Sequence, residues 1–407
     1  MKSSSNIMNN TETKYLPLLF KLNDVNIDFL NIFNTDKKDQ KKSKDTADVK
    51  LSSTMMLPLI TLGFHHFIRR TRNSMVITKK QDFSNDIYYI VNKFECNIPN
   101  YDENIDKVAL EYFNALEINN ELLLSHDIYI FWEILILFKL SDYKSFTVIN
   151  NHNNDLDKFK IAIHNYYKKI LNIDAPNISE IDADIVLGND KLENLELDDN
   201  YEEQKSYYLL LSEIISMLKC QNENGSFILK IFDIFTMPTV KLLYILCSLY
   251  KECYIYKPYF SRSSSTEKYI ICKYYKYNKA NKQIKSCISS LSKCSDILKS
   301  NNIYDIYPDL MIPHAFLYNI KFINIKIANV QQIVINQIIK YITQGNYYGD
   351  KYHSYREQQI ESIRWWSKTF FPLVDSMINK EEIQSMLNFI EEKNNVELSR
   401  FISALLI

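Results

Sequence analysis

The sequence predicts an α/β protein whose mainly parallel sheet is covered by helices on both faces. Apolar runs of strand length alternate with longer segments in which apolar residues recur at helical spacing, an alternation typical of a parallel sheet. Residues 225–236, "GSFILKIFDIFT", form a nearly continuous apolar run, as expected for an inner strand buried on both faces. Hydrophobic residues make up 46% of the 407 residues and charged residues 24%, which is the balance of a folded globular protein.

The individual elements follow from these patterns in chain order. Short runs rich in β-branched and aromatic residues predict strands at 75–80, 86–95, 144–151, 183–189, 225–236, 253–259 and 267–275. Apolar residues at helical spacing predict helices at 106–119, 126–140, 155–171, 202–220 and 238–250. Beyond residue 281 the strand signals fade, and the patterns at 329–342 and 380–394 predict a helical C-terminal region.

The chain is expected to divide into three parts. Residues 36–50 are charged and almost without apolar side chains, which predicts a solvated linker behind a short N-terminal extension. We therefore expect an extension and linker at 1–54, an α/β domain at 55–280 and a helical region at 281–407.

Composition and missing motifs exclude several classes of function. The formal net charge is -1, so no chain-wide basic field indicates nucleic-acid binding, and such binding has to be local. The seven cysteines form no CxxC pair, which favours reduced thiols over a disulfide framework or a zinc site. The histidines show no HExxH or paired-ligand spacing, so no metal site is predicted. The P-loop and GxSxG motifs are also absent. The sequence has no apolar run of about 18 residues and no signal peptide, so we expect a cytoplasmic protein without a membrane segment.

A single lysine, Lys230, interrupts the apolar run at 225–236. A buried ammonium is costly without an anionic partner, so Lys230 is expected to face a carboxylate. Downstream follow "KP" at 257–258, "SR" at 261–262 and "SSTE", which ends at Glu267. Together with the upstream "LGFHHFIRRTRNSM" and "FWEILILF", these motifs resemble the FtsJ-like RNA ribose 2'-O-methyltransferases, in particular those of large DNA viruses of eukaryotes.

This resemblance implies a Rossmann-like methyltransferase sheet and a catalytic tetrad of lysine, aspartate, lysine and glutamate. A ribose hydroxyl is a weak nucleophile, so a lysine with a lowered pKa helps to remove its proton while carboxylates position that lysine. Lys230 corresponds to the central lysine and Glu267 to the glutamate, and their charged atoms should lie within about 6 Å of each other at the carboxyl edge of the sheet. The alternative interpretation of the pair is a buried ion pair inherited from an enzyme.

The other half of the tetrad departs from the family pattern. Asn189 occupies the position of the catalytic aspartate, and Asp190 can substitute only if the turn shifts by one residue. The first lysine of the tetrad should come from the helix at 126–140, but Ile130 occupies the aligned position.

The residues expected to bind the cofactor depart further from the family pattern. S-adenosylmethionine requires a glycine-rich turn after the first strand, so that the backbone and a helix N-terminus can approach the ligand. The corresponding turn has Asn153, Asn154 and Asp155 and no glycine. Only about 30 residues separate this strand from the strand predicted at 183–189, whereas the family has two further strand-helix units between them and a single βαβ unit needs about 30 residues. The part of the sheet that binds the adenosine is therefore expected to be truncated. We therefore predict no cofactor, or S-adenosylmethionine if the protein is active.

Several basic residues are candidates for RNA binding. The stretch "HHFIRRTRN" contributes Arg69, Arg70 and Arg72, and the "KP" and "SR" motifs add Lys257 and Arg262. These side chains could contact RNA phosphates or a cap, and a solvated basic loop is the alternative for the arginine cluster. The pair "WW" at 365–366 suits base stacking or the anchoring of a partner, with packing of a helix on the core as the alternative.

Three functional hypotheses follow. The first is a degenerate homologue that acts as a non-catalytic subunit or RNA-binding module in viral mRNA capping or transcription, with a protein partner and capped RNA, in the host cytoplasm or the virion. The second is an active S-adenosylmethionine-dependent cap methyltransferase with a divergent cofactor loop, and the third is a structural virion protein. We favour the first because Asn189, the missing first lysine and the missing glycine turn occur together.

Overall fold

The computed structural model describes residues 18–22, 49–54, 57–74, 126–140, 145–149, 177–178, 183–188, 202–261, 263–278, 280–299, 301–344, 349–371 and 380–405. The strands predicted at 75–80 and 86–95 and the helices predicted at 106–119 and 155–171 lie outside the described residues. The same holds for Asn153, Asn154, Asp155, Asn189, Asp190 and Arg262.

A seven-stranded sheet forms the centre of the fold, in the order β1-β7-β8-β6-β5-β3-β4. Its strands are β1 (Leu18–Lys21), β3 (Ser145–Ile149), β4 (Asn177–Ile178), β5 (Ala183–Gly188), β6 (Gln221–Ile231), β7 (Tyr250–Lys257) and β8 (Lys268–Tyr275). Neighbouring strands are parallel from β4 to β6, as predicted, whereas β8, β7 and β1 add antiparallel pairings. The connection between β7 and β8 covers residues 258–267, which is too short for the crossover that parallel neighbours need.

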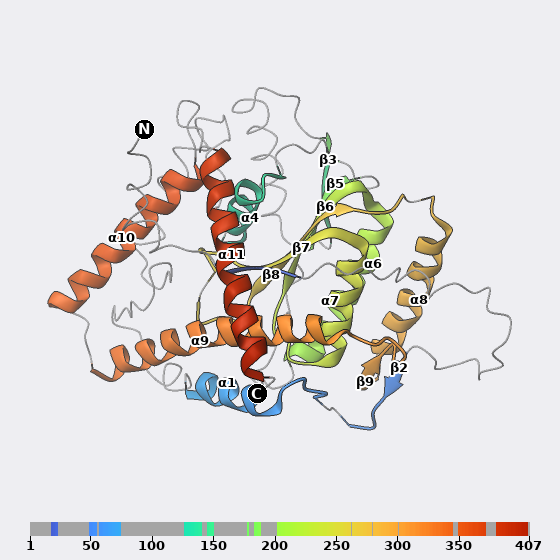
Figure 1. Cartoon of the computed structure of the whole chain (residues 1–407), viewed down its shortest axis with the longest axis horizontal. Coiled ribbons are helices and arrows are strands. Elements are labelled where there is room, and N and C mark those ends of the chain that lie inside the picture. Colours follow the sequence, from blue (N-terminus) through green and yellow to red (C-terminus); the bar gives the residue numbers. More distant parts are fainter. Residues whose placement is uncertain are drawn as a thin grey trace.

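Helices cover both faces of this sheet (Figure 1). α6 (Glu202–Cys220), α7 (Met237–Leu249) and α8 (Lys282–Leu298) lie on one side, and α4 (His126–Leu137) and α10 (Asp350–Phe370) lie on the other. α7 has Pro238 in its first turn, where the fixed φ of proline suits a helix, and it is buried along nearly its whole length. α8 follows Asn281, whose side chain accepts a hydrogen bond from the Gln283 backbone N–H at 2.8 Å and so caps the helix.

Segments from both ends of the chain join this central domain. β1 lies in the predicted N-terminal extension and extends the sheet beyond β7, while β2 (Val49–Leu51) pairs with β9 (Ile303–Ile306) in a separate two-stranded sheet. The predicted C-terminal helices are present as α9 (His314–Gln344), α10 and α11 (Lys380–Leu405), and α1 (Leu62–Ser74) packs against α9. β9 is a strand in a region where the sequence predicts only helices. The domain boundaries themselves remain a prediction.

The main core lies between the sheet and the helices α6 and α7, where apolar side chains of β5, β6 and β8 are almost completely buried. The described cysteines are all unbridged and buried. No helix in the described part of the chain is long and apolar enough to cross a membrane. The described residues also contain no cluster of His, Cys, Asp and Glu side chains that could hold a metal ion.

Candidate functional site

Lys230 lies one residue before the end of β6, at the edge where the parallel strands finish. Its Nζ is 2.7 Å from Glu267 Oε1, so the predicted salt bridge is confirmed, and the two side chains are only 11% and 15% exposed. The pair meets because β8 is antiparallel to β6 and begins at this same edge, with Lys230 directly opposite Tyr269. The Tyr269 hydroxyl donates a second hydrogen bond to Glu267 Oε1 at 2.8 Å.

A third charged residue, Asp127, completes this cluster, and the sequence reasoning missed it. Asp127 lies in the first turn of α4, and its Oδ1 is 3.8 Å from Lys230 Nζ. Ile130, which the resemblance aligns with the family's first lysine, is fully buried. Helix α4 therefore presents a carboxylate to Lys230, while the resemblance led us to look for a lysine on this helix. A charged residue beside a long apolar run is the signal that could have indicated Asp127.

The electrostatic surroundings of Lys230 keep it protonated. Burial by itself would lower the Lys230 pKa, but the carboxylates of Glu267, Asp127 and Glu213 outweigh burial, and the pKa is raised above its ordinary value. Glu213 comes from α6 and is buried beneath the sheet edge. The groups that raise the pKa are all acidic, so Lys230 is an ammonium ion at neutral pH. An ammonium ion cannot accept the proton of a ribose hydroxyl.

The space between Lys230 and α6 is very small. Lys230, Glu213 and Asp233 line a cavity of about 10 Å³, which is roughly the room that one water molecule needs. Close packing beside Glu213 explains why Gly188, the last residue of β5, has no side chain. A Cβ atom on Gly188 would lie 2.7 Å from Leu229 Cδ1 and 3.1 Å from the Glu213 carboxyl group, so a larger residue would require these two side chains to shift.

The loop between β7 and β8, which ends with Glu267, is held by buried hydrogen bonds. Lys257 is 5% exposed, and its Nζ donates to Ser261 Oγ at 2.8 Å, to Ser265 Oγ at 3.0 Å and to the Glu267 backbone carbonyl at 2.7 Å. Gln331 of α9 donates to the Ser264 carbonyl at 2.6 Å. The "KP" lysine thus lies inside the loop and fixes the backbone that carries Glu267.

The arginines of α1 differ in their surroundings. Arg72 makes a bidentate ion pair with buried Asp233, at 2.5 and 2.9 Å, and donates to Gln331 Oε1 at 3.1 Å. Burial would raise the pKa of Asp233, but the Arg72 guanidinium outweighs it and holds that pKa below its usual value. Arg69 is half-buried and Arg70 is exposed. Arg69 and Arg70 are therefore the RNA-binding candidates of α1 that reach solvent.

The tryptophan pair packs on the protein itself. Trp366 is completely buried, and its Nε1 donates to Glu133 Oε2 at 2.7 Å. The ring of Trp365 lies 5.1 Å from that of Tyr259 in an edge-to-face arrangement. Glu133, on α4, also accepts hydrogen bonds from the Tyr256 hydroxyl and the Tyr259 backbone N–H, so it joins α4, α10 and the loop after β7. Trp366 fits the core interpretation of this motif.

The site and its sheet match a known family. Residues 147–275, which contain β5, β6, β7, β8 and the Lys230–Glu267 pair, match the family described as FtsJ-like methyltransferase. Residues 147–275 form an FtsJ-like methyltransferase domain.

Similar proteins include enzymes named for cap methylation. The chain is 27% identical over 201 residues to cap-specific mRNA (nucleoside-2'-O-)-methyltransferase 1 of Caenorhabditis elegans. The aligned region covers 46% of this chain and 20% of the relative. The chain is 29% identical over 140 residues to an uncharacterized protein of Acanthamoeba polyphaga mimivirus, covering 34% of this chain and 39% of the relative. It is 30% identical over 113 residues to inactive cap-specific mRNA (nucleoside-2'-O-)-methyltransferase 1B of Caenorhabditis briggsae. This aligned region covers 28% of this chain and 13% of the relative. The chain thus spans less than half the length of each of these relatives.

Proposed function

We propose that this protein is a catalytically degenerate homologue of the cap 2'-O-methyltransferases that acts as a non-catalytic subunit or RNA-binding module in viral mRNA capping or transcription. The observation that carries the proposal is the Lys230 cluster, in which Asp127 and Glu267 surround the lysine. The similarity to a mimivirus protein supports the viral setting, and we place the protein in the host cytoplasm or the virion.

The cluster argues against proton removal for an electrostatic reason. A neighbouring cation would lower the pKa of a central lysine and favour its neutral form, whereas neighbouring carboxylates raise the pKa and favour the ammonium form. Asp127 approaches from the helix on which the family pattern expects a lysine. Lys230 therefore holds Glu267 and Asp127 together, and this role stabilises the fold without any substrate.

The proposal includes no bound cofactor. The turn that contains Asn153, Asn154 and Asp155 lacks glycine, and Asn189 replaces the acid of the tetrad. A non-catalytic role leaves capped RNA and a protein of the capping or transcription machinery as partners. Arg69 and Arg70, on the solvent side of α1, are the residues we propose for contact with RNA phosphates, together with Arg262.

The second candidate function is an active cap methyltransferase. The 2.7 Å contact between Lys230 and Glu267 favours it, because two members of the tetrad lie together as an active site would require. The two functions differ in whether S-adenosylmethionine binds.

The test measures the melting temperature of the full-length protein with and without millimolar S-adenosylmethionine, followed by methyl transfer to capped RNA. A ligand at 100 times its Kd stabilises a protein by about 2.7 kcal/mol, which raises the melting temperature by a few degrees. We expect no shift and no methylation, and we expect capped RNA to bind less tightly to the Arg69→Gln/Arg70→Gln variant. A shift that the demethylated product competes away, with methylation that is lost in Lys230→Ala, would establish the active enzyme instead.

A further inference from the structure

The solvent-facing side of α1 combines an exposed aromatic ring with positive charge. Phe67 and Arg70 are both exposed, and residues three apart on a helix share one face. The Phe67 side chain is 45% exposed. Ile68, by contrast, faces the interior, where it packs with Phe235 and Ala328. The packing of α1 on the rest of the fold therefore does not depend on Phe67.

The surface around α1 lacks acidic residues. Residues 49–81 contain no Asp or Glu, and neither do residues 310–349, which include all of α9. α1 packs against α9, and Figure 1 shows the two helices side by side at the lower edge of the molecule. Over the whole chain the charges nearly balance, with 48 Lys and Arg against 49 Asp and Glu. The pair formed by α1 and α9 is thus locally positive.

Some of the cations on these two helices are neutralised by carboxylates from other elements. Arg72 pairs with Asp233, and Lys326 of α9 pairs with a glutamate of α11. Among the described residues, no carboxylate lies within salt-bridge distance of Arg69 or Arg70. A polyanion that approaches α1 would therefore meet two guanidinium groups that no described carboxylate neutralises.

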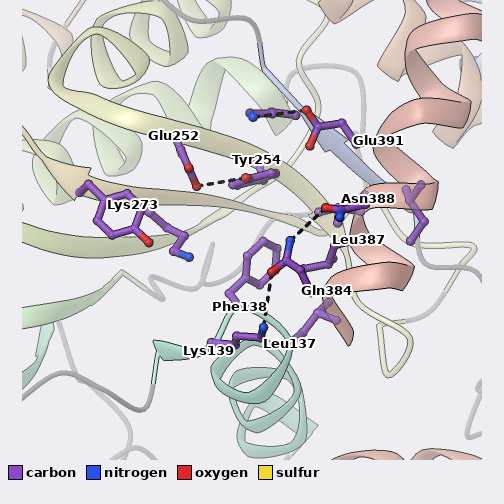
Figure 2. A pocket seen from close by; sticks show the side chains of 14 residues that line it. Leu137, Phe138, Lys139, Glu252, Tyr254, Lys273, Gln384, Leu387, Asn388 and Glu391 are labelled. Atoms are coloured by element: carbon purple, nitrogen blue, oxygen red, sulfur yellow. Dashed lines mark hydrogen bonds and ion pairs between the residues drawn. The ribbon is translucent and has the colours of Figure 1, made fainter. Parts of the chain in front are cut away.

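A cavity of about 320 Å³ between α4, β1, β7, β8 and α11 shows no such preference for one sign of charge (Figure 2). Lysines and glutamates line it together. Lys21 forms an ion pair with Glu391 at 3.3 Å, and Glu252 accepts a hydrogen bond from the Tyr254 hydroxyl at 3.1 Å. The surface of α1 is the better match for a negatively charged polymer.

Hydrogen bonds connect α1 to the loop of the Lys230 cluster. Arg72 donates to Gln331 Oε1 at 3.1 Å, and Gln331 Nε2 donates to the Ser264 carbonyl at 2.6 Å. Ser264 lies in the loop that ends with Glu267, the partner of Lys230. A polymer bound along α1 would therefore lie beside the sheet edge that holds this cluster.

The combination of an exposed ring and unneutralised arginines fits single-stranded RNA. Arginine side chains contact phosphates, and an aromatic side chain stacks on bases that are not paired. In an RNA duplex the bases stack on one another and pair, so they are not available to a ring on the surface of a helix. Stacking on a ring tolerates any base, so this surface would bind RNA without reading its sequence.

We propose that the solvent face of α1 binds single-stranded RNA, with one base stacked on Phe67 and the adjacent phosphates held by Arg69 and Arg70. This inference rests on the RNA-binding part of the proposed function. It adds the base contact, and it makes the binding independent of a cap.

The test measures the fluorescence anisotropy of labelled, uncapped RNA of about ten nucleotides, single-stranded or as a duplex, during titration with the full-length protein. The variants are Phe67→Ala and Arg69→Gln/Arg70→Gln. The matched control is Phe389→Ala on α11. Phe389 is 49% exposed, close to the 45% of Phe67, but its neighbour three residues further along the helix is the exposed acid Glu392.

Phe67→Ala should weaken the binding of single-stranded RNA at least about fivefold, the lower limit for the loss of one base stack, and leave duplex binding unchanged. Phe389→Ala should bind like the wild type. The slope of log affinity against log salt should keep its value in Phe67→Ala. In the arginine variant it should become shallower by about 1.4, because each phosphate contact to a single strand contributes about 0.7.

Equal binding by the wild type and Phe67→Ala, or an equal loss in Phe389→Ala, would overturn the inference. A loss confined to the arginine variant would also overturn it, but would leave the RNA-binding role of the proposed function intact. If the wild type at about 100 µM, the weak end of non-specific affinities, binds neither RNA, the inference is wrong and a protein partner is left for this face. Methyl transfer to capped RNA would overturn the proposed non-catalytic role without changing any of these binding results.

Discussion

Replacement of Lys230 by methionine is expected to destabilise the fold, because it leaves two carboxylates without their cation. The side chains of Lys230, Glu267 and Asp127 are between 11% and 15% exposed, and the lysine lies 2.7 Å from one carboxylate and 3.8 Å from the other. Loss of one partner from a buried ion pair typically costs about 3–5 kcal/mol. Because these groups retain slight exposure, we expect Lys230→Met to lower the free energy of unfolding by about 3 kcal/mol. Glu267→Gln should lower it by about 1–2 kcal/mol, because Asp127 still pairs with the lysine in that variant.

The pH dependence of this effect follows from the direction of the pKa shift. The Lys230 pKa is raised, so the stabilisation is fully present below the ordinary lysine pKa and is lost only as the pH rises through the higher folded value. The destabilisation by Lys230→Met should therefore be the same at pH 6 and pH 9. A lysine with a lowered folded pKa would instead make the wild type more stable as the pH rises through this interval, so the effect of the substitution would differ between the two pH values.

The assay is urea denaturation of the wild type, both single variants and the double variant, with exposed Lys251→Met as the control. The double-mutant cycle should give a coupling energy of about 1–3 kcal/mol between Lys230 and Glu267. If Lys230→Met is as stable as the wild type or more stable, the cluster is not a structural element. That result would fit a site arranged for a substrate at the expense of stability, and the reasoning behind the proposed function would be refuted.

Three further predictions concern other buried charges. Glu133→Gln should lower the free energy of unfolding by at least about 2 kcal/mol, because the new amide nitrogen faces buried donors that then lack an acceptor, and normal stability would contradict this. Burial raises the pKa of Glu133 and of Glu203 to about 7 from the ordinary 4.5, so the folded state retains protons that the unfolded state has lost. The free energy of unfolding, measured with urea, should therefore fall between about pH 4.5 and 7 and level off above pH 7. A rise over this interval would contradict the prediction. Arg72→Met should lower the free energy of unfolding by about 3–5 kcal/mol, because it leaves the buried Asp233 carboxylate without its cation. Arg70→Met on the exposed face should change the free energy of unfolding by less than about 0.5 kcal/mol in the same assay.

The sequence predicted best those elements whose pattern is strong over many residues. β6 is recognisable because its apolar run is long enough to be buried on both faces, and α6 because its apolar residues recur at helical spacing. The contact between Lys230 and Glu267 was predictable because both lie at strand ends in an apolar setting. β1, β2 and β9 are three or four residues long and pair with strands distant in sequence, so no local pattern specifies them.

The partners of the charged residues were harder to predict. Asp127 stands out as a charged residue beside an apolar helix, but the sequence does not show that its partner is Lys230, which lies 103 residues further along the chain. Arg72 was read as part of a basic RNA-binding stretch, yet its guanidinium pairs with Asp233, 161 residues further along the chain. A charge run shows that charges are present. Which of them face solvent depends on tertiary contacts that the run does not encode.

The residues that we propose as retained and as lost members of a tetrad differ in what the fold requires of them. Lys230 and Glu267 bind each other, so the loss of either leaves an uncompensated charge at a buried site and carries a folding penalty. Lys257 and Arg72 are held in the same way by buried partners. A residue that contacts only a cofactor or substrate carries no such penalty, and it can change once catalysis is no longer needed. The persistence of Lys230 and Glu267 is therefore expected from folding alone, and it is cofactor binding, rather than the presence of these two residues, that separates an active enzyme from a degenerate one.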